Sequence, residues 1–193
     1  KLVMVSVPLN SMTEASNVFG RTSVAQEAPR GTTVYFWNLT PTPGWVNNTK
    51  GLSGWAAAYS NRVVVPGEGF MMKSATTSTL PIEVTITGEV PDADPLNFGI
   101  AGGSNLNMVA NAYPVDVIFG QTPLAIGALR GPPVFFGDVT ANGGAGGGVQ
   151  NTRGLSGWAA AYSNRVVQAG EGFMLKEAGT SRVWTNAKPY TWP

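Results

Sequence analysis

Carboxylates are the main candidates for acid or base chemistry in this chain. The sequence has no His and no Cys, so it lacks the commonest general base, the thiol nucleophile and the usual ligands of zinc and copper. It has only 11 acidic residues, and their spacing shows no pair of the kind that a glycosidase uses. We therefore expect a protein that is not an enzyme.

Three short motifs could be mistaken for binding sites. Glu68 and Glu171 lie in identical Gly-Glu-Gly sequences, which could form a duplicated carboxylate site, but a tight turn with a solvated Glu is the favoured interpretation. Asp92 and Asp94 form an Asp-x-Asp, yet a calcium loop needs more oxygen ligands than follow here. Gly143–Gly148 lacks the Gly-Lys-Ser/Thr ending of a phosphate loop. The sequence therefore predicts no metal and no cofactor.

Composition excludes further classes of partner. The net charge is +1 without a basic patch, which argues against nucleic acid. No run of 18 apolar residues is present, so we expect no membrane span. The low share of charged residues, 12%, together with 25 Gly and 14 Pro, indicates a turn-rich β protein.

An internal repeat decides the expected architecture. The 14 residues Gly51–Val64 recur unchanged as Gly154–Val167, and Gly67–Lys73 recurs with small changes as Gly170–Lys176. The period is about 100–104 residues. We therefore expect two tandem homologous units, at 1–90 and 96–193, with a Pro-containing linker at 91–95.

The local patterns predict an all-β fold, with each unit a small sandwich or barrel and at most short helices. Strand-like segments are Leu2–Val7, Thr32–Trp37 and the alternating Ile82–Thr87. Arg62–Val65 and Phe70–Lys73 flank a Pro-Gly turn and suggest a hairpin. Short helices are expected at 13–19 and 115–119, whereas Trp55–Tyr59 fits a helical turn or a strand.

Aromatic residues divide into a shared and an unshared set. The shared set has the same context in both units, which indicates core packing: Trp55, Trp158, Tyr59, Tyr162, Phe70 and Phe173. The unshared set gives the candidate interface or ligand residues: Trp37, Trp45, Trp184, Tyr190 and Trp192. Exposed rings can stack on sugars or anchor an interface. The alternative is that they cover the edges of the core.

The two ends of the repeat differ. Leu96–Ile100 leads into the second unit, whereas no equivalent precedes Leu2, and the second unit ends in the aromatic tail. If each lead-in strand pairs with the neighbouring unit, the chain has an open edge at its start and an adhesive segment at its end. Open edges invite strand addition, and head-to-tail contacts form rings or filaments.

Several blocks resemble a known pattern: Leu-x-Met-Val, Val-[Tyr/Phe]-Phe, [Pro/Ala]-Gly-Glu-Gly-Phe-Met and Thr-Gly-Glu-Val-Pro. They are similar to tandem β-rich repeats of uncharacterised exported proteins of environmental bacteria. This resemblance implies an exported β-rich module and no activity. The chain opens directly on the strand-like Leu2–Val7, so we expect the mature form of an extracellular or surface protein.

These observations lead to two expected functions. The first is a structural extracellular or surface protein that self-assembles as a homo-oligomer or homopolymer, in a filament, tube or layer, through head-to-tail strand or aromatic-tail contacts. The alternative is a carbohydrate-binding or adhesive module without catalysis, which would use Trp37 and Trp45 to bind polysaccharide.

Overall fold

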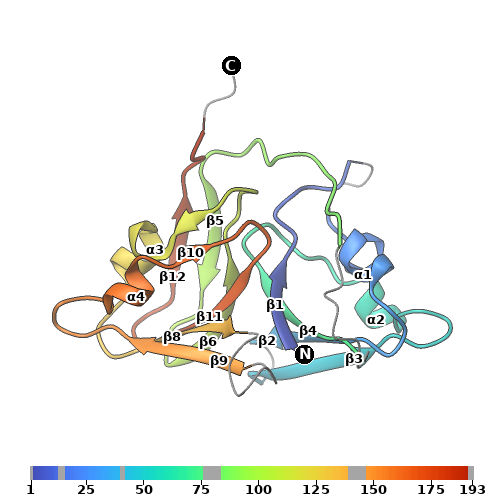
Figure 1. The fold of residues 1–193 in the computed structure, drawn as a ribbon, viewed down its shortest axis with the longest axis horizontal. Coiled ribbons are helices and arrows are strands. Elements are labelled where there is room, and N and C mark those ends of the chain that lie inside the picture. Colours follow the sequence, from blue (N-terminus) through green and yellow to red (C-terminus); the bar gives the residue numbers. More distant parts are fainter. Residues whose placement is uncertain (1, 13–15, 40–41, 76–83, 139–146, 191–193) are drawn as a thin grey trace.

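The computed structural model describes residues 2–12, 16–39, 42–75, 84–138 and 147–190, and within them the fold is all-β. Two four-stranded antiparallel sheets dominate it (Figure 1). The first sheet has the order β1-β4-β2-β3, with bounds Leu2–Ser6, Gly69–Lys73, Thr33–Asn38 and Gly44–Thr49. We call residues 2–90 the first half and residues 96–190 the second half.

The second half repeats this arrangement. Its sheet has the order β6-β11-β8-β9, with bounds Asn105–Ala110, Gly172–Glu177, Pro133–Asp138 and Gly147–Thr152. Two smaller antiparallel pairs also occur in this half: β5 (Leu96–Ile100) with β12 (Arg182–Asn186), and β7 (Val117–Ile118) with β10 (Val166–Val167). The equivalent strand order follows from the repeat in the sequence.

Helices are short and lie on the two outer sides of the sheets (Figure 1). The α-helices are α1 (Ser23–Glu27), α2 (Ala57–Ser60), α3 (Pro123–Gly127) and α4 (Ala160–Ser163), and the 3-10 turns are η1 (Phe19–Arg21) and η2 (Phe119–Gln121). In the described part of the chain, no helix has the length and apolar character to span a membrane.

The positions of the helices differ from those expected. Residues 13–15 lie outside the described part, and residues 16–18 are not helical. In the second half, Val117 and Ile118 form β7, because β-branched residues fit an extended pair with β10. The helices begin later, where Thr22 and Thr122 cap α1 and α3 by accepting hydrogen bonds from backbone N–H groups.

The predicted hairpin between Arg62–Val65 and Phe70–Lys73 is wrong. β4 is a central strand that pairs with β1 on one edge and with β2 on the other. Both of its edges are therefore filled. Val63 instead forms an isolated bridge with Val18.

Each half has its own aromatic core. Phe19, Phe36 and Phe70 are buried in the first half, with ring centroids 5.2–5.6 Å apart. Phe119, Phe136 and Phe173 repeat this cluster at 5.1–5.6 Å. The shared tryptophans pack against these clusters, and Trp55 and Trp158 each donate an indole N–H to a helix carbonyl at 3.0 Å. The expected core packing of the shared aromatics is confirmed.

Reciprocal backbone hydrogen bonds join the two halves. The N–H of Ser6 donates to the carbonyl of Gly170 at 2.9 Å, and the N–H of Ala110 donates to the carbonyl of Gly67 at 2.9 Å. Ser6 is the last residue of β1, and Ala110 is the last residue of β6. Each bonds to the turn that precedes the central strand of the other half, which is β11 or β4. The contact has the form of a two-fold interface within one chain.

Bridges extend this contact into a ring of strands. Val5 bridges Glu171, and Val109 bridges Glu68. Because β1 also pairs with β4, and β6 with β11, these single bridges link the four strands in a ring, through the residues directly before β4 and β11. The boundary at 91–95 thus remains a prediction from the sequence, since the halves share this ring.

Candidate functional site

The lead-in strand pairs within its own half. In the ladder between β5 and β12, Phe98 lies opposite Trp184 and Ile100 lies opposite Arg182. Ile100 is buried in the second core, and Phe98 packs against it. The structure therefore corrects the expectation that this strand pairs with the neighbouring unit.

The first half has an extended segment, Val84–Gly88, beside its core. Val84 and Ile86 pack against this core, as Phe98 of β5 packs against the second. In the repeat Lys73 matches Lys176, so β12 aligns with residues 79–83, which lie outside the described part of the chain. Exposure alternates along Val84–Gly88, as in a half-buried strand. Yet Val84–Gly88 forms no β-ladder with any described residue; the first bridge comes at Glu89, which pairs with Asn10.

Burial differs between β12 and Val84–Gly88. In β12, which β5 covers, Trp184 is 2% exposed and Asn186 is 6% exposed. Val84 and Ile86 are partly buried, as is Phe98 in the paired strand β5. We call Val84–Gly88 the open strand. No described residue forms a ladder with its backbone, and at its end Gly88 lies against Leu9 and Asn10.

The aromatic tail is held on its own chain as far as the structure describes it. The backbone N–H of Lys188 donates to the Asp94 carboxylate at 2.8 Å, and the ring of Tyr190 meets that of Tyr113 edge-on at 6.1 Å. Trp192 lies outside the described residues. Trp184 belongs to the core, 6.4 Å from the ring of Phe173, so we do not retain it as an interface or ligand residue.

Trp37 and Trp45 come together on the face of the first sheet that lies away from its core. They lie directly opposite each other in the ladder between β2 and β3, with ring centroids 5.0 Å apart and planes at 68°. Phe36 points into the core, so Trp37, the next residue, points to the other face. Trp45 is 37% exposed, whereas Trp37 is partly buried.

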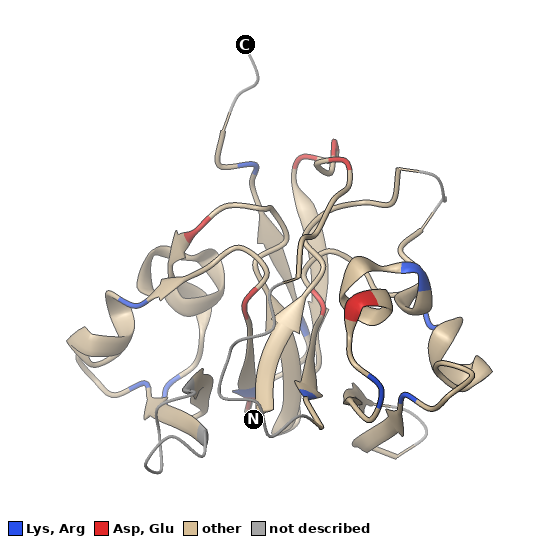
Figure 2. Ribbon diagram, turned by 45° about the vertical axis from the view of Figure 1, so that its right-hand side comes forward, with Lys and Arg blue, Asp and Glu red and all other residues tan. Residues whose placement is uncertain are grey.

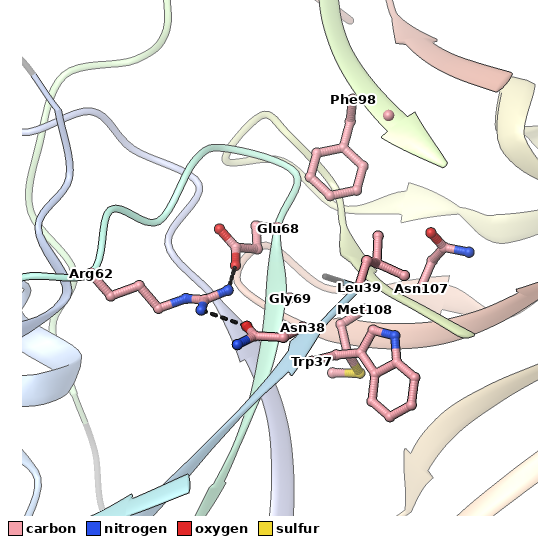
Figure 3. Close-up of a pocket in the computed structure, with 10 residues that line it drawn as sticks. Trp37, Asn38, Leu39, Arg62, Glu68, Gly69, Phe98, Asn107 and Met108 are labelled. Carbon is pink, nitrogen blue, oxygen red and sulfur yellow. Dashed lines mark hydrogen bonds and ion pairs between the residues drawn. The ribbon is translucent and has the colours of Figure 1, made fainter. Parts of the chain in front are cut away.

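A pocket of about 390 Å³ lies beside Trp37, between the two halves (Figure 3). The first half contributes one wall and the second half contributes the other. The lining residues are Trp37, Asn38, Leu39, Arg62, Glu68 and Gly69 from the first half, and Phe98, Gly99, Asn107 and Met108 from the second.

Arg62 organises the polar wall of this pocket. Its guanidinium donates to Asn38 Oδ1 at 2.8 Å and to Glu68 Oε1 at 3.0 Å, as Figure 3 shows, and it lies 4.3 Å from the centroid of Phe36. Glu68 Oε2 also accepts the N–H of Val65 at 3.3 Å. The Glu68 side chain is only 17% exposed, so the expectation of a solvated turn residue is wrong.

The second half keeps the ion pair but lacks the tryptophan. Arg165 lies 2.6 Å from Glu171 and 4.6 Å from the ring centroid of Phe136, as in the first half. Gly137 stands at the position of Trp37, with Met4 close to it: a Cβ there would lie 3.6 Å from the Met4 methyl. The ion pair therefore belongs to the shared framework, whereas Trp37 is an addition to it.

Charged groups are few around the pocket, apart from the pair Arg62–Glu68. Among the described residues, no group of three or more acidic side chains is placed to hold a metal ion. Arg62 and Glu68 neutralise each other, and Figure 2 shows that the other charged residues are sparse and dispersed over the ribbon. Comparison with protein-family models, curated proteins and solved structures gave no match.

Proposed function

We propose that this protein is a non-catalytic structural subunit of the extracellular space or the cell surface, and that copies of it assemble by strand addition. The open strand carries the proposal. It is an extended segment that forms no ladder with any described residue, whereas β12, beside the second core, has a five-residue partner. Unpaired strand edges are templates for pairing with another chain.

The second half shows which kind of strand fits. β5 places Leu96, Phe98 and Ile100 on the side facing the core, with Asn97 and Gly99 on the exposed side. A strand with apolar residues at alternate positions would therefore cover Val84 and Ile86 while filling the backbone ladder. We assign this role to a strand of a second copy.

The geometry of such a contact is directional. The acceptor, Val84–Gly88, occurs in the first half, whereas β5 and β12 of the second half already pair with each other. Donor and acceptor are therefore different surfaces. Contacts of this type are heterologous, and they produce a ring when the rotation closes and a filament when it does not.

A single cysteine can report on the open strand, because the natural chain has none. We would attach a nitroxide label to Thr85→Cys and, as the matched control, to Thr185→Cys. Thr185 lies on β12, where its hydroxyl already bonds Asn97 of β5 at 2.9 Å. As protein concentration rises, we expect sedimentation to show assembly and the label at Thr85 to become immobile, while the label at Thr185 does not change.

Two other outcomes would overturn the proposal. A protein that stays monomeric at all concentrations, by sedimentation and electron microscopy, is not a self-assembling subunit. Assembly that leaves the Thr85 label mobile would show that another surface makes the contact.

A further inference from the structure

The pocket beside Trp37 carries an inference that is independent of assembly, since none of its lining residues belongs to the open strand. We propose that it binds a neutral carbohydrate. Its volume, about 390 Å³, falls within the range of small-molecule sites, roughly 300–1,000 Å³.

Aromatic surface lies on both sides of the pocket. Trp37 comes from the first half and Phe98 comes from β5 of the second half, as Figure 3 shows. Trp45 extends the aromatic surface outward, because it packs against Trp37 and is itself exposed. The C–H faces of a sugar ring are apolar and pack well against such rings.

The polar wall has hydrogen-bonding groups that are already fixed in place. The guanidinium of Arg62 only donates, so Asn38 must present its carbonyl oxygen to it, and the orientation of the amide is settled. The Asn38 NH₂ group then has no partner among the described residues. The indole N–H of Trp37 is likewise buried without an acceptor in that part of the chain.

Charge selects the class of ligand. Arg62 and Glu68 form an ion pair at 3.0 Å, so the wall offers donors and acceptors without net charge. A phosphate or a carboxylate would compete with Glu68 for Arg62 and be repelled by it. A hydroxyl both donates and accepts, and it therefore fits this wall better than an anion does.

The two halves provide an internal comparison. The Arg165–Glu171 pair keeps the same geometry without a tryptophan, because Gly137 stands where Trp37 would be. The shared framework thus folds without this side chain. A large, partly buried aromatic residue on the face away from the core is best explained by what it contacts in the pocket.

The test is binding to an array of neutral and anionic oligosaccharides, followed by titration calorimetry of the best neutral ligand. We expect Trp37→Ala to weaken binding at least about tenfold, the effect of losing a stacked ring. Tyr35→Ala is the matched control, because Tyr35 lies two residues earlier on the same face of β2 and outside the pocket. It should bind like the natural protein.

Asn38→Asp gives a second variant that places the residue of the second half, Asp138, at this position. It removes the NH₂ donors and adds a charge beside Glu68, so we again expect weaker binding. This variant decides the question if Trp37→Ala does not fold.

The proposal is overturned if the array shows no neutral ligand, if only anionic glycans bind, or if Trp37→Ala and Asn38→Asp bind normally. Sedimentation of both variants should still show assembly.

Discussion

Burial and a hydrogen bond both affect the protonation of the Tyr113 phenol. It is 1% exposed, and its hydroxyl donates to the carbonyl of Ala93 at 2.7 Å. Burial raises the pKa of Tyr113, and the nearby charge of Asp94 adds to this effect. Folding therefore favours the protonated phenol. The stabilisation is complete below the ordinary pKa, about 10, and is lost as the pH rises through the raised value.

The first prediction concerns Tyr113→Phe. At pH 8 we expect a loss of about 1 kcal/mol in the free energy of unfolding, because one buried hydrogen bond disappears. As the pH rises above 10, the free energy of unfolding should fall less in the variant than in the natural protein. Urea unfolding between pH 8 and pH 11 measures both effects, and Tyr35→Phe is the control for loss of a phenol. Parallel pH curves for the natural protein and Tyr113→Phe would contradict the explanation.

The candidate residues could be predicted only in part from sequence. Trp37 stands out because its counterpart is Gly137, and it does line the pocket. Trp184 also lacks an aromatic counterpart, but its burial depends on the strand pair β5–β12, which residue type alone does not reveal. The role of Arg62 could have been predicted, because an arginine precedes the Gly-Glu-Gly turn in both repeats, Arg62 in the first and Arg165 in the second.

At the scale of elements, the 3-10 turns pack closely against the short helices. A Cβ at Gly20 would lie 2.7 Å from Ser60 Cβ, and one at Gly120 would lie 2.5 Å from the carbonyl oxygen of Ser163. Both neighbours belong to the last residue of a helix, α2 or α4. Glycine is required here because there is no room for a side chain.

The second prediction follows from this contact. Gly120→Ala should lower the free energy of unfolding by about 2 kcal/mol or more, since backbone atoms must move to accept the methyl group. Gly148→Ala is the control, because its Cβ would meet its nearest neighbour at an ordinary 3.7 Å. Urea unfolding of both variants checks the difference. Equal stability of the two would contradict the close approach seen at η2.

Strand existence was easier to predict than strand partners. Leu2–Val7 contains β1, and Thr32–Trp37 contains all of β2 except its last residue, as their β-branched and apolar residues indicate. Ile82–Thr87 has an equally clear alternation, yet its described residues form no ladder. Periodicity reports which face of a strand is buried and says nothing about what lies at its edges. The pattern of residues therefore does not reveal that β4 pairs with β1 and β2, nor that the open strand forms no ladder with the described residues.

At the scale of the whole molecule, the ring of β1, β4, β6 and β11 couples the two cores. Gly69 and Gly172 show how close this coupling is. A Cβ at Gly69 would lie 2.8 Å from the carbonyl oxygen of Val109, and one at Gly172 would lie 3.0 Å from that of Val5. Opening one half therefore exposes and disturbs the other.

The third prediction is a single unfolding transition. Phe36→Ala and Phe136→Ala remove equivalent rings that are fully buried in the two cores. Each should lower stability by about 3–5 kcal/mol, and each should shift the one transition without splitting it. Calorimetry measures this through the ratio of calorimetric to van't Hoff enthalpy. Two separate transitions in either variant would show that the halves unfold independently.

Reciprocal hydrogen bonds join the two halves, between Ser6 and Gly170 and between Ala110 and Gly67. The two halves are also covalently connected, and this connection affects how stable their interface has to be. A short tether holds its two ends at an effective concentration in the ~millimolar range. An interface that would dissociate between separate molecules can therefore persist within one chain. The two halves of the chain are then free to diverge in sequence. A symmetric pair of units can thereby become a molecule with two different ends. The first half of this chain has both the open strand and Trp37, and the second half has neither.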